Sequence, residues 1–342
     1  MGRGRSRRRR RDHHPELRRL PGHADEVGAE DRRAADRVGR VADWRRRGQR
    51  PNRRARPGQR HRRRHRNPGP PASYRQDHAG PVREEACDAG RQCNELAAEM
   101  VRDRPDRFGG FACLPLPDVD GALAELAYAF DDLRLDGAVL FSNARGIYLG
   151  DSRFDPLFEE LQRRAAVVFV HPNPSPGPSA HALGLPDNLI DFTADTTRAI
   201  AHLHYSNTLA RTPEVKYVFS HAGGTVPFLA GRFAILDEMD VIPGSEARAT
   251  AAETFRHLYW DTAAAWGDPV LRMLRDVAGI DHVVFGTDYP YLPHHLGVSC
   301  RADIQASPEL TENERTAILG DTATKLIPRL AALRHQARTR AS

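Results

Sequence analysis

The fold of this chain is decided by residues 166–172, which read AVVFVHP. Five apolar residues in a row, followed by His171 and Pro172, are typical of a strand buried on both faces, because such a strand has no solvent side to carry alternating polar residues. Two later stretches follow the same plan: residues 215–224 read VKYVFSHAGG, and residues 282–290 read HVVFGTDYP. We therefore expect a buried parallel sheet whose strands end in polar residues.

Helical patterns separate the apolar runs along the C-terminal three quarters of the chain. We expect strands at 107–114, 137–141, 166–170, 215–219, 258–260 and 282–285. We expect helices at 94–104, 119–133, 157–164, 190–209, 228–238, 270–277, 312–319 and 323–333. The alternation predicts an α/β fold with six β/α units. Two architectures fit: a doubly wound open sheet, or an eight-stranded TIM-type (β/α) barrel that lacks its first two units.

The N-terminal part of the chain has a different composition. Residues 1–92 hold 28 Arg against 12 acidic residues, although the whole chain holds 51 basic and 45 acidic residues. The same segment contains two Leu and no Ile or Phe, so it cannot bury enough apolar surface to offset the entropy lost on ordering. We expect residues 1–92 to be a disordered basic segment and residues 93–342 to be the folded domain.

Composition and motifs disfavour several classes of protein. The four cysteines, at 87, 93, 113 and 300, form no CxxC pair, which argues against a zinc ribbon or a disulfide framework and suits a reducing cytoplasm. No apolar run is long enough to cross a membrane. The sequence has no GxSxG, P-loop or HExxH motif. The Arg clusters lack interleaved aromatic residues, so nucleic-acid binding is the interpretation with least support.

Side chains that can bind a metal stand at the ends of three expected strands. His171 follows Val170, His221 follows Ser220, and Asp288 comes shortly after the run that ends at residue 285. The carboxyl ends of parallel strands meet at one edge of the sheet, where such folds build their active sites. Two imidazoles and a carboxylate can hold a divalent metal and leave room for water or substrate. Each residue alone is more often a strand-boundary or turn residue, but the threefold recurrence predicts a metal site.

A set of short motifs runs through the same region in a fixed order. They are PDRFG at 105–109, LPLPD at 114–118, DG at 136–137 with SN at 142–143, YLGD at 148–151, FVHP at 169–172, SHAGG at 220–224 and FGTDYP at 285–290. With these motifs, residues 93–342 resemble the amidohydrolase-related (amidohydrolase 2) family, in particular the decarboxylase branch typified by aminocarboxymuconate-semialdehyde decarboxylase. The resemblance implies the barrel of the metal-dependent hydrolase superfamily.

The resemblance also implies roles for the strand-end residues. His171 and Asp288 would be metal ligands, with zinc as the expected metal, and His221 would handle a proton beside a metal-bound water. Family members carry two further ligands in a His-x-His or Glu-x-His pair on the first strand. The nearest counterpart here is Asp12-His13-His14, which lies between Arg runs and Pro15 rather than in an apolar strand.

The basic segment has about the length that the family uses for its first two β/α units. Arg, Pro, Gly, Ala and His are abundant in it, and their codons are GC-rich. We therefore interpret residues 1–92 as a misread frame in place of those units; the alternative is a genuine basic tail on a shorter protein.

The function that the resemblance implies is non-oxidative decarboxylation of an unsaturated or aromatic carboxylic acid. The same residues could instead hydrolyse an ester, lactone or amide, and a further alternative is a nucleic-acid-binding segment on an inert barrel. The expected partner is a small carboxylic acid and not a membrane, with a homodimer as the expected assembly. Candidates for substrate contact in the loops are Arg145, Tyr148, Trp266 and Tyr289.

Overall fold

The computed structural model describes residues 80–173, 186–239, 242 and 249–333. The chain divides into two units, residues 1–68 and 69–342, and every described residue belongs to the second unit. The disorder expected for residues 1–79, and the Asp12-His13-His14 sequence within them, lie outside the described residues.

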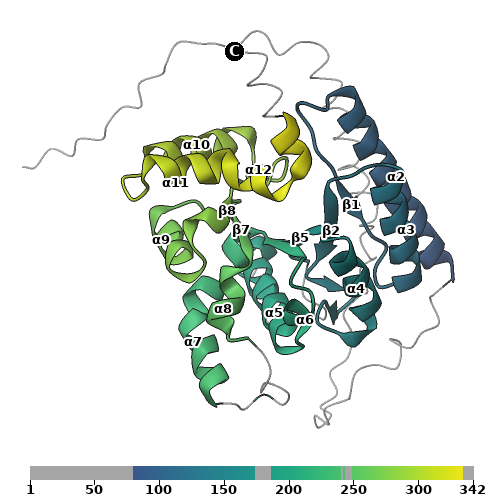
Figure 1. Cartoon of the computed structure of the whole chain (residues 1–342), viewed down its shortest axis with the longest axis horizontal. Helices are drawn as coiled ribbons and strands as arrows, with labels where there is room; N and C mark the ends of the chain where they lie inside the picture. The colour runs from purple at the N-terminus through teal and green to yellow at the C-terminus, as the bar shows by residue number, and fades with distance from the viewer. Residues whose placement is uncertain (1–79, 174–185, 240–241, 243–248, 334–342) are drawn as a thin grey trace, which may run out of the picture. The chain divides into compact units, whose positions relative to one another are not determined.

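Six parallel strands form one sheet whose spatial order follows the chain (Figure 1). The strands are β1 (Phe111–Cys113), β2 (Gly137–Phe141), β5 (Val167–His171), β6 (Lys216–Phe219), β7 (Tyr259–Asp261) and β8 (Val283–Val284). A doubly wound sheet reverses its strand order partway across, and this sheet does not. The winding is therefore that of six consecutive units of a (β/α) barrel, and the open-sheet alternative is wrong.

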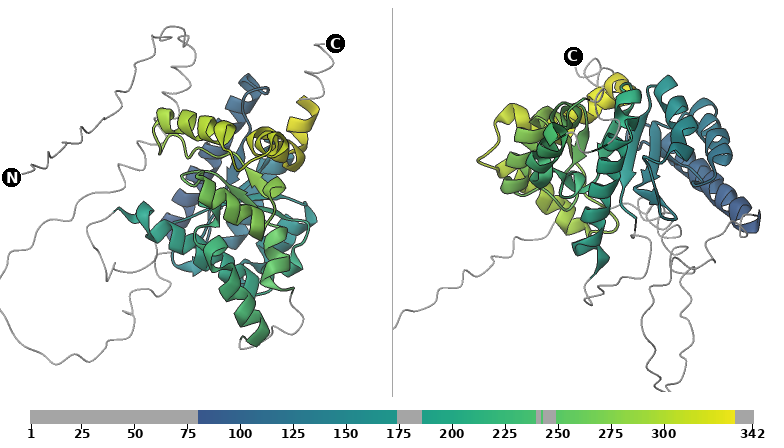
Figure 2. Two further views of the ribbon diagram at one scale, coloured as in Figure 1. Left: turned by 90° about the vertical axis from the view of Figure 1, so that its left-hand side faces the viewer. Right: turned by 90° about the horizontal axis from the view of Figure 1, so that it is seen from below.

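Helices cover the outer face of the sheet (Figures 1 and 2). They are α2 (Gly80–Asp103), α3 (Val119–Asp131), α4 (Asp155–Arg163), α5 (Asp191–Tyr205), α6 (Thr208–Arg211), α7 (Val226–Met239), α8 (Ala251–Arg256), α9 (Asp268–Val277), α10 (His294–Ala306), α11 (Glu312–Thr316) and α12 (Thr322–Leu326). Single turns occur at η2 (Ser152–Phe154), η3 (Asp187–Leu189), η4 (His221–Gly223), η5 (Ile280–His282) and η6 (Ala317–Asp321). None of the helices within the described ranges has the length and apolarity needed to span a bilayer.

The strands divide their side chains between two apolar layers, because successive residues point to opposite faces. The larger layer lies between sheet and helices and includes the buried side chains of Phe158, Tyr217, Phe219 and Trp260. A smaller layer lies on the opposite face of the sheet and consists of Val167, Val218, Val284 and Leu326, with the partly buried Phe111, Phe169, Tyr259 and Ile327 packed against them. This inner face thus carries an apolar layer below the strand ends.

Helix α2 begins earlier than the sequence pattern indicates. The pattern places its start at residue 94 and predicts disorder through residue 92, but the helix spans Gly80–Asp103. Its early turns pack through polar contacts: Arg91 Nε donates to Glu125 Oε2 at 2.8 Å, and Cys87 Sγ lies 3.8 Å from Asp118 Oδ2. The pattern of apolar residues does not reveal such contacts, so the helix starts upstream of its expected position.

Other elements also differ from the expectation, each for a local reason. The stretch 190–209 forms two helices because Asn207 adopts a left-handed conformation with φ of 66°. The expected helix 323–333 is interrupted at Ile327, immediately before Pro328. Helix α10 and the antiparallel hairpin β3 (Asn143–Ala144) and β4 (Ile147–Tyr148) were not expected. Helix α10 buries few side chains, so its apolar period is weak.

Arg329 ties the C-terminal segment to the β1–β2 side of the sheet. Its guanidinium donates to both carboxylate oxygens of Asp136, at 2.8 and 2.9 Å, and to the carbonyls of Pro105 and Phe108, at 2.6 and 2.8 Å. The Asp136 side chain is only 5% exposed. Because β1 and β8 are the two edges of the sheet, this contact links the segment that follows β8 to the opposite edge.

Replacing Arg329 by Ala should lower the free energy of unfolding by about 2–3 kcal/mol, because it leaves a buried carboxylate without its charged partner. Urea denaturation of the full chain measures the loss. The matched control is Arg272→Ala, since Arg272 pairs with Glu309 in an exposed ion pair and should cost under about 1 kcal/mol. Equal losses of unfolding free energy in the two variants would show that Arg329 does not stabilise the link between the two edges of the sheet.

Candidate active site

Three polar side chains from different strands meet at the carboxyl edge of the sheet. His171 is the last residue of β5, His221 follows β6 by two residues, and Asp288 comes shortly after β8. Donor atoms of all three lie within 4.8 Å of one another. The structure therefore brings together the three residues that the sequence singles out.

The distances within this cluster suit a shared ion. His171 Nε2 lies 4.0 Å from Asp288 Oδ1, and His221 Nε2 lies 3.7 Å from Asp288 Oδ2. Both distances are too long for hydrogen bonds. Donors bound to one ion at about 2.1 Å can be up to about 4.2 Å apart, so small side-chain rotations would place all three on one ion.

The orientation of His171 is fixed by a backbone contact. Its Nδ1 lies 2.8 Å from the carbonyl oxygen of Pro172. A carbonyl only accepts, so Nδ1 carries the proton and donates, which leaves the lone pair of Nε2 facing the cluster. This arrangement is common around histidine ligands of metals.

The backbone beside the cluster is held in unfavourable conformations. His221, Ala222 and Asp288 have φ values of 54°, 53° and 55°, in the left-handed region that non-glycine residues rarely adopt. Gly223, with φ of 69°, lies against Trp260, and a Cβ at this position would come within 2.0 Å of the indole. Strain of this kind persists only where surrounding packing imposes it, and it is concentrated at functional sites.

Asp261 holds this strained turn in place and was not identified from the sequence. It is the last residue of β7, and its Oδ1 accepts hydrogen bonds from the backbone N–H groups of His221 at 2.7 Å and Ala263 at 3.0 Å. Burial raises the pKa of Asp261 to about 6. A Cβ on Gly286 would lie 2.8 Å from Asp261 Oδ2, so glycine is required there. The signal was available, since Asp261 also ends an apolar strand.

A second buried carboxylate organises the loops around His171. Asp195 on α5 is fully buried and accepts hydrogen bonds from Ser142 Oγ, from Asn143 Nδ2 at 2.9 Å and from Tyr148 OH at 2.5 Å. Ser142 Oγ in turn accepts from the backbone N–H of Asn173 at 2.9 Å. Asp195 therefore connects the loop after β2, the β3–β4 hairpin and the segment that follows His171.

The four expected substrate-contact residues have varied surroundings. Tyr148 donates to Asp195, and Trp266 Nε1 donates to Asp303 Oδ2 at 2.9 Å. Arg145 forms the turn of the hairpin with φ of 52°. Tyr289, next to Asp288, is 60% exposed. Substrate contact by these residues stays a prediction, and the hydrogen bonds of Tyr148 and Trp266 give each a structural role.

The donor set fits a divalent ion, although it is smaller than the family's set. Two imidazoles and one carboxylate are ligands that zinc and manganese accept. No other His, Cys, Asp or Glu of the described ranges joins the cluster. The first-strand pair of the family thus has no counterpart in the part of the chain that the structure describes.

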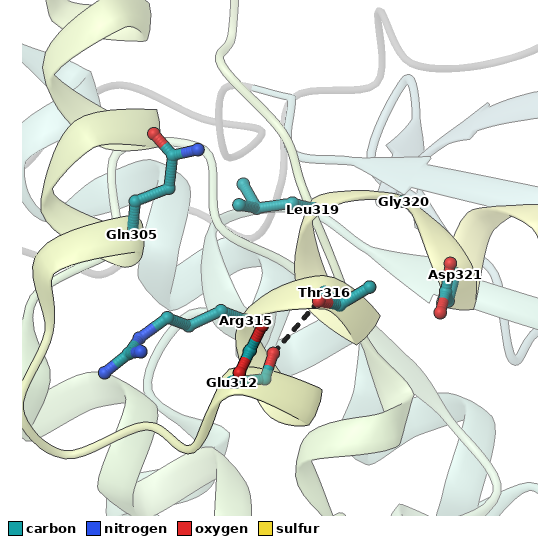
Figure 3. A pocket seen from close by; sticks show the side chains of 7 residues that line it. All are labelled: Gln305, Glu312, Arg315, Thr316, Leu319, Gly320 and Asp321. Atoms are coloured by element: carbon teal, nitrogen blue, oxygen red, sulfur yellow. Dashed lines mark hydrogen bonds between the residues drawn. The ribbon is translucent and has the colours of Figure 1, made fainter.

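A separate hollow of about 440 Å³ lies over α10, α11 and η6 (Figure 3). Gln305, Glu312 and Arg315 are among the side chains that line it. None of the cluster residues contributes to this hollow, so it is not part of the candidate active site.

Comparison with known proteins gives a consistent picture. The family model described as "Amidohydrolase" matches residues 12–329. The chain is 34% identical over 259 residues to 6-methylsalicylic acid decarboxylase of Penicillium expansum, covering 74% of this chain and 79% of that protein. It is 27% identical over 251 residues to 2-amino-3-carboxymuconate-6-semialdehyde decarboxylase of Dictyostelium discoideum, covering 71% and 67%. The solved 5-carboxyvanillate decarboxylase from Sphingomonas paucimobilis superposes with a TM-score of 0.66 at 25% identity, covering 73% of this chain and 76% of that one.

Replacing Asp195 by Ala should destabilise the full chain by about 3 kcal/mol or more, because the buried donors of Ser142 and Asn143 and the half-buried hydroxyl of Tyr148 lose their acceptor. Thermal unfolding followed by circular dichroism measures the effect. The control is Asp151→Ala, because Asp151 pairs with Arg153 near the surface and its loss should cost under about 1 kcal/mol. An Asp195 variant as stable as the control would contradict the organising role.

Proposed function

Because the chain belongs to the amidohydrolase family, as its motifs predict, we propose that it is a metal-dependent non-oxidative decarboxylase of an unsaturated or aromatic carboxylic acid. The observation that carries the proposal is the convergence of His171, His221 and Asp288 at one strand edge. The similar proteins described above are named as decarboxylases, which supports this reaction over hydrolysis.

The proposed chemistry divides the cluster into two roles. His171 and Asp288 would hold the ion, expected to be zinc, which would supply positive charge to the substrate carboxylate and to negative charge that develops nearby. His221 supplies the proton to the carbon that loses its carboxylate. The bond between that carbon and the carboxylate breaks, its electron pair takes up the proton, and the carboxylate leaves as carbon dioxide.

Two features of the structure support His221 as the proton carrier. Its side chain is 11% exposed, less than the 27% of His171. Its backbone N–H is anchored by Asp261, which fixes the start of the strained turn. Imidazole is the side chain most often used for proton transfer in catalysis, and here it is shielded and positioned.

The chain as written should bind metal weakly and turn over slowly, because it lacks a described counterpart of the family's first-strand ligand pair. Metal analysis of the purified full chain should find well under one zinc per molecule. Stoichiometric zinc together with rapid turnover would show that His13, His14 or another group completes the site.

We further propose that a reading-frame error replaces the first two barrel units. The family match starts at Asp12, so the basic segment stands where those units would be. Helix α2 begins at Gly80, which supports a break upstream of that codon rather than near Cys93. The nucleotide sequence before it, read in all three frames, should encode an apolar strand with a His-x-His or Glu-x-His pair; no such open frame would defeat this proposal.

In the enzyme with its frame restored, His221→Ala should abolish decarboxylation while the metal content stays the same. The reaction is followed in deuterated water by NMR, where the product should carry deuterium at the vacated carbon. The matched control is His257→Ala, an exposed histidine at the end of α8. Loss of metal together with activity would make His221 a ligand, and cleavage of esters without release of carbon dioxide would make the enzyme a hydrolase.

A further inference from the structure

We infer that Phe141 determines substrate choice at this site by packing against the planar ring of an aromatic acid. The inference rests on the proposed function, because it concerns the same site. Phe141, His171 and Asp261 are the last residues of β2, β5 and β7. By the alternation of side chains along a strand, they lie on the same inner face as the apolar layer of Val167 and Phe169.

Phe141 and His171 stand side by side at the same level of the barrel. They are register partners on neighbouring strands. Their ring centroids are 6.3 Å apart, with planes at 81° to each other. A molecule that contacts His171 at the mouth therefore meets the Phe141 ring next to it.

The Phe141 ring contacts His171 by its edge and is otherwise largely exposed. It is 43% exposed, whereas Leu140, which points to the opposite face of the same strand, is 2% exposed. An aromatic ring exposed beside polar side chains that could hold a metal is placed to contact a ligand bound there. The exposed ring face is thus available to a substrate.

A second aromatic ring flanks His171 from another element. Phe192, on the first turn of α5, lies with its ring centroid 6.4 Å from that of His171 and its plane at 76°. The site is therefore polar where His221 and Asp288 lie and aromatic beside His171. This division matches a planar ring that carries a carboxylate.

Aromatic rings prefer edge-to-face or offset contact with other rings, which adds affinity beyond that of apolar area alone. A flexible unsaturated chain or a saturated ring of the same size makes such contacts poorly. The geometry therefore favours an aromatic acid over an aliphatic unsaturated acid, and Phe141 is the residue that makes the distinction.

The test compares binding of two acids of similar size to the full chain in excess zinc, measured by ligand-observed NMR. The probes are 2-hydroxybenzoate, which is planar and aromatic, and 2-hydroxycyclohexanecarboxylate, which is neither. The aromatic acid should bind at least about 5-fold more tightly. Phe141→Ala should weaken binding of the aromatic acid about 10-fold and binding of the saturated acid under about 3-fold. Phe141→Leu should bind the aromatic acid with an affinity between those of the wild type and Phe141→Ala.

Val298→Ala is the matched control, since Val298 is 56% exposed on α10, and it should change neither affinity. Circular dichroism checks that each variant is folded, and Phe141→Leu preserves most of the side-chain volume. Equal losses for both acids in Phe141→Ala, an unchanged affinity for the aromatic acid, or no saturable binding of either acid would overturn the inference.

Failure of the inference is distinguishable from failure of the proposed function. Phe141-dependent binding of 2-hydroxybenzoate without release of carbon dioxide by the restored enzyme would count against decarboxylation and support the role of Phe141. Release of carbon dioxide that is unaffected by Phe141→Ala would overturn the role of Phe141 alone.

Discussion

The arrangement of this molecule depends on parallel strand pairing in sequential order. Because all six strands run in one direction, their carboxyl ends share one edge of the sheet, and whatever follows each strand meets there. His171, His221 and Asp288 are far apart in the sequence, yet their donor atoms lie within 4.8 Å. No local motif could achieve this, since the three residues come from three separate β/α units.

Strand pairing alone does not orient these side chains. Hydrogen bonds to buried polar groups fix their orientation. Asp261 holds the backbone of His221 in a strained turn, and Pro172 fixes the tautomer of His171. Asp195 fastens the loops on either side of His171 from within α5. Each of these carboxylates is buried with hydrogen-bond donors around it, which is the condition under which a buried charge is tolerated. These hydrogen bonds position the site through groups of the protein itself.

How much of this could be predicted from the sequence depends on the kind of interaction. The strand-end residues His171, His221 and Asp288 could be predicted because apolar runs mark the strands and polar residues mark their ends. Asp195 could not, because a carboxylate inside a helix looks like a surface residue until its three donors from other segments are known. The early start of α2 could not be predicted, because its first turns pack through polar contacts and the pattern of apolar residues does not reveal them.

The mouth-facing role of Phe141 also depends on the three-dimensional structure. In the sequence it is the last apolar residue of GAVLF and is indistinguishable from a core residue. Its exposure follows from the register, which aligns it with His171 at the end of the interior face, beyond the packed layer of Val167 and Phe169. Register is set by pairing with other strands, so one strand's composition does not reveal it.

The central claim is that His171 and Asp288 hold one divalent metal beside His221, and titration of the full chain with cobalt(II), followed by visible absorption, tests it most directly. The account predicts weak but saturable binding of one equivalent, with absorption bands that disappear in both His171→Ala and Asp288→Ala and persist in His257→Ala. Bands that are unchanged by the first two substitutions, or no saturable binding even in excess metal, would contradict the account.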